Sequence, residues 1–244
     1  MNKLYEKSEL GFALLWIGLY VFGSSVTDTI SIAIGIYKSV TLFFYIVLTV
    51  ISLVWLKKNG LLKKYGLCKT DIRLSKFLWF IPIPVMISSN SWYGVALNSE
   101  VFETVINIFL MLCVGYLEEI IFRGFLFKAM AKDNVKSAII VSSVTFGIGH
   151  IVNLFNGSGM SLVANLCQIA CAVAFGFLFV IIFHRGKTLL PCIVAHSGIN
   201  ALGVFVNEAN VTPENQIIIS TVLIIMAVGY TLILLKTLPQ SEKA

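Results

Sequence analysis

The sequence predicts an all-α, polytopic membrane protein: a bundle of about eight transmembrane helices with both termini in the cytoplasm. Of the 244 residues, 58% are hydrophobic and only 12% are charged, a composition far too apolar for an ordinary soluble domain. The apolar residues fall into stretches long enough to cross a bilayer, and basic loops follow every second stretch. We expect one domain over residues 1–244 and no soluble domain.

Eight apolar stretches approach the roughly 20 residues that a helix needs to cross a bilayer core. They cover residues 10–27, 40–56, 77–90, 103–122, 137–153, 161–183, 188–206 and 216–236. The third, fourth and fifth are the least regular, because Pro82 and Pro84 interrupt the third and charged or polar residues interrupt the others. The first resembles a signal peptide, but Glu6 and Glu9 dilute its positive start, so we expect it to be retained as a span.

Lysine and arginine predict the orientation, because short loops rich in these residues stay in the cytoplasm. The loops after the second, fourth and sixth spans hold most of them: Lys57, Lys58, Lys63, Lys64, Lys69, Arg73, Lys76, Lys128, Lys132, Lys136, Arg185 and Lys187. The alternate loops are poor in basic residues, with only Lys38 in the first. An arrangement of eight spans with both termini in the cytoplasm places each of these basic loops on the cytoplasmic side of the membrane. The net charge of +6 is therefore a topology signal, and we expect no nucleic-acid partner.

Charged and imidazole side chains inside the spans mark a candidate site. The fourth span carries Glu118, Glu119 and Arg123, although a charge near the middle of a helix in lipid costs about 2.5–3.5 kcal/mol. Glu119 and Arg123 are four residues apart, so they stack on one helix face and can form an ion pair that holds the helix in place. Glu118 is turned about 100° away from Glu119 around the helix axis. Its charge is tolerable within the bilayer only if the side chain faces a wet cavity.

The two intramembrane histidines follow the same spacing rule. Phe146 precedes His150 by four residues, and His196 precedes Asn200 by four, so each pair shares a helix face. At about 1.5 Å of rise per residue, Glu118 and both histidines fall in the cytoplasmic half or near the midplane of the bilayer. Polar groups within lipid face the bundle interior and share partners. We therefore expect one common cavity.

These side chains suit hydrolysis. Glu118 can take a proton from water, a histidine can orient that water or protonate the leaving amine, and Asn200 or a histidine can stabilise an oxyanion. Alternatively, Glu118, His150 and His196 could hold Zn²⁺, which accepts imidazole and carboxylate ligands and activates its own water. No HExxH motif is present, and five cysteines without paired spacing predict neither a disulfide framework nor a zinc knuckle. We expect catalysis without a metal, with zinc as the alternative.

At these residues the chain resembles the CAAX prenyl protease and bacteriocin-processing family of intramembrane proteases, also called the abortive-infection family. Three motifs carry the resemblance, in order within a core of residues 115–203: Glu118-Glu119-x-x-x-Arg123, Phe146-x-x-x-His150 and His196-x-x-x-Asn200. The resemblance implies that four residues are catalytic: Glu118, His150, His196 and Asn200. It implies that three further residues support them: Glu119, Arg123 and Phe146.

The resemblance also implies an activity and a location. Family members hydrolyse a peptide bond of a membrane-associated protein or peptide, prenylated in eukaryotic members, at a site open to the cytoplasm. Bacterial relatives act in peptide processing, bacteriocin self-immunity or surface regulation, so we expect this chain in the cell membrane of a bacterium. Its partners would be the bilayer and a membrane-associated, in some cases lipidated, substrate.

Two non-hydrolytic interpretations compete with this hypothesis. A proton-coupled transporter would show helix-breaking residues at matching places in two repeated halves, and no such repeat is visible. An immunity protein acting by contact would keep its function without Glu118. In either case Glu119 and Arg123 would be a structural pair, and the histidines would be hydrogen-bond partners between helices.

Overall fold

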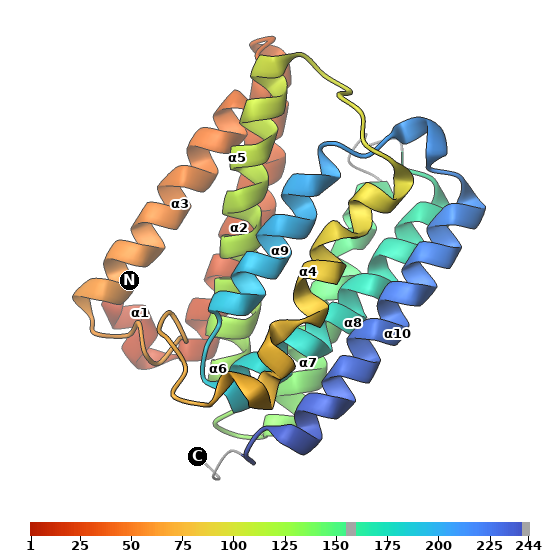
Figure 1. Ribbon diagram of the computed structural model, residues 1–244. Helices are drawn as coiled ribbons and strands as arrows, with labels where there is room; N and C mark the ends of the chain where they lie inside the picture. Colours follow the sequence, from red (N-terminus) through yellow and green to blue (C-terminus); the bar gives the residue numbers. More distant parts are fainter. Residues whose placement is uncertain (155–159, 241–244) are drawn as a thin grey trace.

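The computed structural model describes residues 1–154 and 160–240, which form a helical bundle without a named strand (Figure 1). The predicted all-α class is therefore confirmed for the described residues. Six helical stretches among them are long and apolar enough to cross a membrane. They are α2 (Glu9–Ala33), α3 (Ser39–Lys58), Val101–Met130, Val135–Leu154, α8 (Leu162–Gly186) and α10 (Pro213–Thr237). Val101–Met130 comprises α5 (Val101–Glu118), η3 (Glu119–Leu126) and α6 (Phe127–Met130); Val135–Leu154 comprises α7 (Val135–Gly149) and η4 (His150–Leu154).

Six of the eight predicted spans form helices that are long and apolar enough to cross a membrane, and the other two form shorter helices. The third divides into η1 (Leu74–Phe80), α4 (Pro82–Ile87) and η2 (Ser88–Tyr93). Leu78, Trp79 and Phe80 have φ angles of 51°, 50° and 57°, which a right-handed helix cannot contain. The seventh forms α9 (Leu190–Gly203), an apolar helix of 14 residues that packs between α5 and α4. Such short helices are tolerated where neighbouring protein shields their ends. Two small helices, α1 (Asn2–Lys7) and η5 (Glu208–Asn210), complete the described elements.

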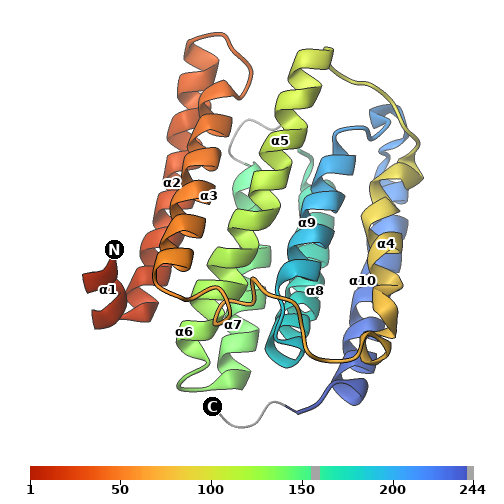
Figure 2. The same cartoon turned by 60° about the vertical axis from the view of Figure 1, so that its left-hand side comes forward.

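The bundle has two chemically different ends. One, which we call the basic end, is formed by residues 57–76, 128–136 and 184–190 and by both termini of the described helical bundle (Figures 1 and 2). Lys64 and Lys132 each contact Glu9 there, at 2.6 and 2.9 Å. Of the lysines and arginines in the described part of the chain, only Lys38 and Arg123 lie elsewhere.

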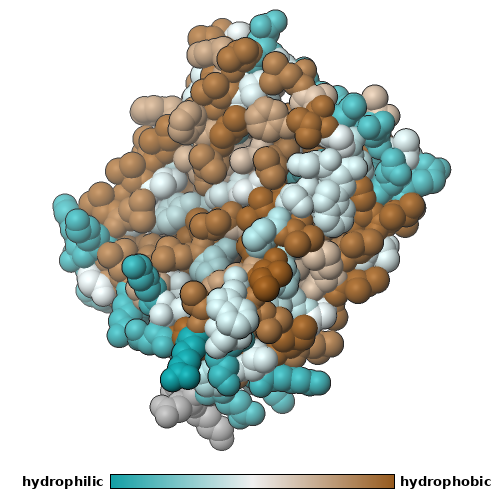
Figure 3. Space-filling view, viewed as in Figure 1, coloured by the Kyte–Doolittle hydropathy of each residue, from teal (hydrophilic) through white to brown (hydrophobic). Residues whose placement is uncertain are grey.

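The opposite end, which we call the distal end, is formed by residues 34–38, 94–100 and 204–212. Ala96 N donates to the Phe205 carbonyl oxygen at 2.9 Å, and Asn107 Nδ2 donates to Tyr37 Oη at 3.1 Å. Apolar side chains such as Phe22, 75% exposed, cover the outward faces between the two ends. Figure 3 shows this apolar surface across the middle of the bundle and hydrophilic side chains gathered at its lower, basic end. This distribution is that of a multi-pass membrane protein.

A glycine sets the distance between the two helices that carry the candidate site. A Cβ atom on Gly115 of α5 would lie 2.5 Å from the backbone nitrogen of Ser197 in α9, closer than real Cβ contacts allow. The Ser197 hydroxyl donates to the Leu112 carbonyl oxygen at 3.1 Å across the same contact. Because His196 adjoins Ser197, this close approach brings its imidazole to the end of α5.

Candidate active site

The paired glutamates lie where the helix changes its winding. Glu118 is the last residue of α5, and residues Glu119–Leu126 continue as a π-helix rather than as the α-helix that the spacing argument assumed. The wider turn is a feature often found at functional sites. All eight residues of the π-helix are buried. The two adjacent carboxylates therefore begin a segment enclosed by other helices.

Glu119 joins two partners at the centre of the bundle. Its Oε1 lies 3.1 Å from Arg123 NH1 and 2.9 Å from His196 Nδ1. The side chains of Glu119 and Arg123 are both 0% exposed. The predicted Glu119–Arg123 ion pair is thus confirmed, and the contact with His196 adds a second role for this carboxylate that the sequence did not predict.

Glu118 points to a different set of groups. The Tyr20 hydroxyl, from α2, donates to Glu118 Oε1 at 2.7 Å. Glu118 Oε2 lies 3.5 Å from His196 Nε2 and has no hydrogen-bond partner among the described residues. His196 therefore stands between the two glutamates, with one ring nitrogen facing each. Tyr20 was missed by the sequence analysis, because no spacing rule relates α2 to a residue 98 positions later.

Phe146 organises the aromatic side of the site. Its ring lies 3.8 Å from Arg123 Cζ, a cation–π contact for the buried guanidinium. The rings of His150 and His196 both meet it edge to face, with centroid distances of 5.4 and 5.6 Å. Phe146 thus spaces the two imidazoles that the sequence predicted to share a cavity. Asn165 of α8 donates to the His150 carbonyl oxygen at 2.8 Å, a positioning contact that the sequence did not indicate.

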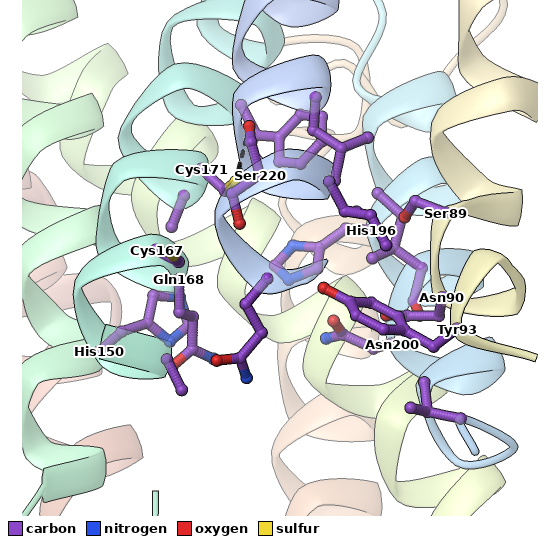
Figure 4. Close-up of a pocket in the computed structure, with 18 of the residues that line it drawn as sticks. Ser89, Asn90, Tyr93, His150, Cys167, Gln168, Cys171, His196, Asn200 and Ser220 are labelled. Atoms are coloured by element: carbon purple, nitrogen blue, oxygen red, sulfur yellow. Dashed lines mark hydrogen bonds between the residues drawn. The ribbon is translucent and has the colours of Figure 1, made fainter. Parts of the chain in front are cut away.

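Two cavities meet at Phe146 and His150, which line both. The first, of about 330 Å³, is also lined by His196 and Asn200 and lies among η2, α8, α9 and α10 (Figure 4). The second, of about 550 Å³, is also lined by Glu118 and lies between α2 and α7. The predicted shared cavity is therefore two adjoining cavities, with the Glu118–His196 contact at their junction.

The four predicted catalytic side chains are accordingly placed in two groups. Glu118 and His196 are in direct proximity, and Asn200 accompanies His196 in the first cavity, as their four-residue spacing indicates. His150 lines both cavities. Figure 4 shows it across the first cavity from Asn200. This arrangement presents a carboxylate, two imidazoles and an amide to two adjoining cavities.

A search for metal-ligand clusters covers the described residues only. Within residues 1–154 and 160–240, no three side chains of His, Cys, Asp or Glu form a group that could hold a metal ion.

The fold and the site define a class: a multi-pass membrane protein with an ionisable centre buried between its helices and reached by cavities. Residues 100–202 match the family model described as Type II CAAX prenyl endopeptidase Rce1-like. This match supports, over this segment of the chain, the resemblance to the CAAX prenyl protease and bacteriocin-processing family. It includes the three motifs, whereas Tyr20 lies outside it. Comparisons with curated proteins and with solved structures gave no match.

Proposed function

We propose that this protein is an intramembrane endopeptidase that hydrolyses a peptide bond of a membrane-associated protein or peptide. One observation carries the proposal: His196 contacts Glu119 through Nδ1 and faces Glu118 through Nε2, at the junction of two cavities. An imidazole held by one carboxylate and facing a second one can orient a water molecule beside the second carboxylate, which acts as the base. The family match supports a CAAX-type protease in general.

Glu118 is the proposed general base. Its Oε1 is occupied by the Tyr20 hydroxyl, which leaves Oε2 directed toward His196 Nε2. A water bound to Oε2 gives up a proton to this carboxylate as its oxygen attacks the carbonyl carbon of the substrate. The protonated Glu118 then returns that proton to the leaving nitrogen as the carbon–nitrogen bond breaks. The products are a carboxylic acid and an amine.

Glu119 selects the tautomer of a neutral His196 ring. A carboxylate paired with Arg123 accepts hydrogen bonds, so the Nδ1 atom of His196 is the donor in their 2.9 Å contact. In the neutral ring Nε2 is then an acceptor that can orient the attacking water beside Glu118. Asn200 and His150, which line the first cavity with His196, are the proposed donors to the oxyanion.

Cleavage by the purified full-length chain tests this proposal. The protein is incubated in lipid nanodiscs with a library of apolar peptides, and mass spectrometry maps any cleaved bond, with and without a chelator. We expect cleavage that resists the chelator, is lost in Glu118→Gln and is lost in His196→Ala. Glu214→Gln, an exposed residue at the start of α10, is the matched control and should cleave normally.

The outcomes separate the alternatives. Loss of cleavage on chelation, restored by Zn²⁺, would contradict the metal-independent mechanism. Activity in Glu118→Gln would contradict its role as the base. A non-hydrolytic immunity protein would give no cleavage at all and would still protect cells that carry Glu118→Gln.

A further inference from the structure

The π-helix that follows Glu118 ends in a wide turn. The Phe127 N–H donates to the carbonyl oxygens of Phe122 and Gly124. The bond to Phe122 spans five residues, the spacing of a π-helix, whereas an α-helix joins residues four apart. The wide turn therefore holds one extra residue. If it closed into a regular α-helix, the side chains before it would be rotated by about 100° relative to those after it.

Such a rotation would disturb the active centre, because Glu119 and Arg123 have partners on different helices. Glu119 Oε1 lies 2.9 Å from Nδ1 of His196, which α9 carries. Arg123 Cζ lies 3.8 Å from the ring of Phe146, which α7 carries. Each of these helices is packed against another, α9 against α5 and α7 against α8, and so cannot follow the rotation. The winding of the segment decides whether both contacts form together.

A buried side chain of α7 bonds to the backbone of the wide turn. The Ser142 hydroxyl donates to the Phe122 carbonyl oxygen at 2.8 Å, the same oxygen that accepts the Phe127 N–H. Ser142 is 0% exposed, so solvent cannot replace this bond. Serines in helices commonly donate to a carbonyl of their own helix, as Ser25 does to Val21 at 3.2 Å. The Ser142 bond instead joins two helices at the wide turn.

The same face of α7 continues into the site. Ser142, Phe146 and His150 follow one another at intervals of four residues, so they lie along one side of the helix. The Phe146 ring meets the Phe122 ring edge to face at a centroid distance of 5.5 Å. This face of α7 thus contacts both the backbone and the side chain of Phe122, and it ends at an imidazole that lines both cavities.

We propose that Ser142 is a positioning residue of the active centre: its hydroxyl holds the wide turn at Phe122 and so keeps Glu119 directed at His196. Ser142 lines neither cavity and acts through Glu119. It also belongs to none of the three motifs. The inference rests on the proposed peptidase function and adds a residue to its machinery.

The next residue in the chain provides a matched control. Ser143 is also 0% exposed, but its hydroxyl has no hydrogen-bond partner among the described residues. It faces α8, where a Cβ atom on Gly176 would lie 2.9 Å from Ser143 Cα. Ser143→Ala therefore removes the same atom as Ser142→Ala, from the same helix and at the same burial, without breaking a bond.

Steady-state cleavage by the purified full-length chain in nanodiscs compares these variants on a peptide that the wild type cleaves. We expect Ser142→Ala to lower kcat about 10- to 100-fold with little change in KM, since a misplacement of about 1 Å can cost 10²-fold. Ser143→Ala should stay near wild type. Ser142→Cys is close to serine in size and keeps a weak donor, so its kcat should lie between those of Ser142→Ala and the wild type.

Nitrogen-15 NMR of labelled histidines separates positioning from a merely structural role. The His196 signals are identified by their absence in His196→Gln, at a pH where the ring is neutral. We expect the proton on Nδ1 in the wild type and in Ser143→Ala, and a population with the proton on Nε2 in Ser142→Ala. A merely structural role would lower the yield of folded protein and leave the tautomer of the folded molecules unchanged.

Three results would overturn the inference. One is a wild-type kcat and an unchanged His196 tautomer in Ser142→Ala. Another is an equal loss of kcat in Ser142→Ala and Ser143→Ala, and the third is a Ser142→Cys variant no more active than Ser142→Ala. Absence of cleavage by the wild type would instead refute the peptidase function, and the tautomer comparison would then decide the role of Ser142 by itself.

Discussion

Glu119→Gln separates the two contacts that converge on Glu119 Oε1. The substitution preserves the shape of the side chain but removes its charge, while Arg123 remains 0% exposed. Removing one partner of a buried ion pair costs about 3–5 kcal/mol, because the other charge is left uncompensated. We expect a loss of this size in the free energy of unfolding, with the cation–π contact to Phe146 retaining part of the stability.

The same substitution should impair catalysis through His196. A glutamine can turn its amide group toward Nδ1 and so favour the wrong tautomer, in which Nε2 carries the proton. In the serine protease triad a comparable carboxylate-to-amide change lowers kcat by about 10⁴. Here, where Glu118 is the base, we expect a fall of about 10²–10⁴ in kcat.

The double variant Glu119→Gln/Arg123→Met distinguishes the two effects. It removes the uncompensated cation, so it should recover stability without recovering cleavage. The measurements are reversible unfolding in mixed detergent micelles and the rate of peptide cleavage for both variants and the wild type. If the double variant recovered full activity, or if Glu119→Gln kept wild-type kcat, Glu119 would have no role in positioning His196, and the reasoning above would be refuted.

The remaining predictions concern contacts that the family motifs do not contain. Tyr20→Phe removes a hydrogen bond to the charged Glu118, worth about 1.5–3 kcal/mol, so kcat should fall about 10- to 100-fold with little change in KM. Tyr45→Phe, on the ring stacked against Tyr20 at 5.3 Å, should leave kcat near wild type, and equal losses in both would refute a specific role. Gly115→Ala forces α5 away from α9 and should cost about 1–3 kcal/mol of stability together with activity. Gly18→Ala in α2, where a Cβ meets nothing within 4 Å, is the matched control, and a comparable loss there would show that helical glycines are sensitive regardless of packing.

The sequence by itself determined the class of the protein and the identity of its polar centre. Apolar length is dictated by the thickness of the bilayer, so the six crossing helices overlap predicted spans closely. Charges are costly in lipid, so Glu118, Glu119 and Arg123 stood out without any structure. Helical spacing then gave the Glu119–Arg123 pair correctly, because residues four apart remain neighbours even where the helix widens.

Only the tertiary structure decided how the elements meet. The periodicity of a sequence shows which face of a helix is buried. It does not show which helix packs against that face, how far the two helices are shifted along their axes, or where each helix ends. Spacing therefore could not show that Tyr20 of α2 reaches Glu118, or that His196 bridges the two glutamates.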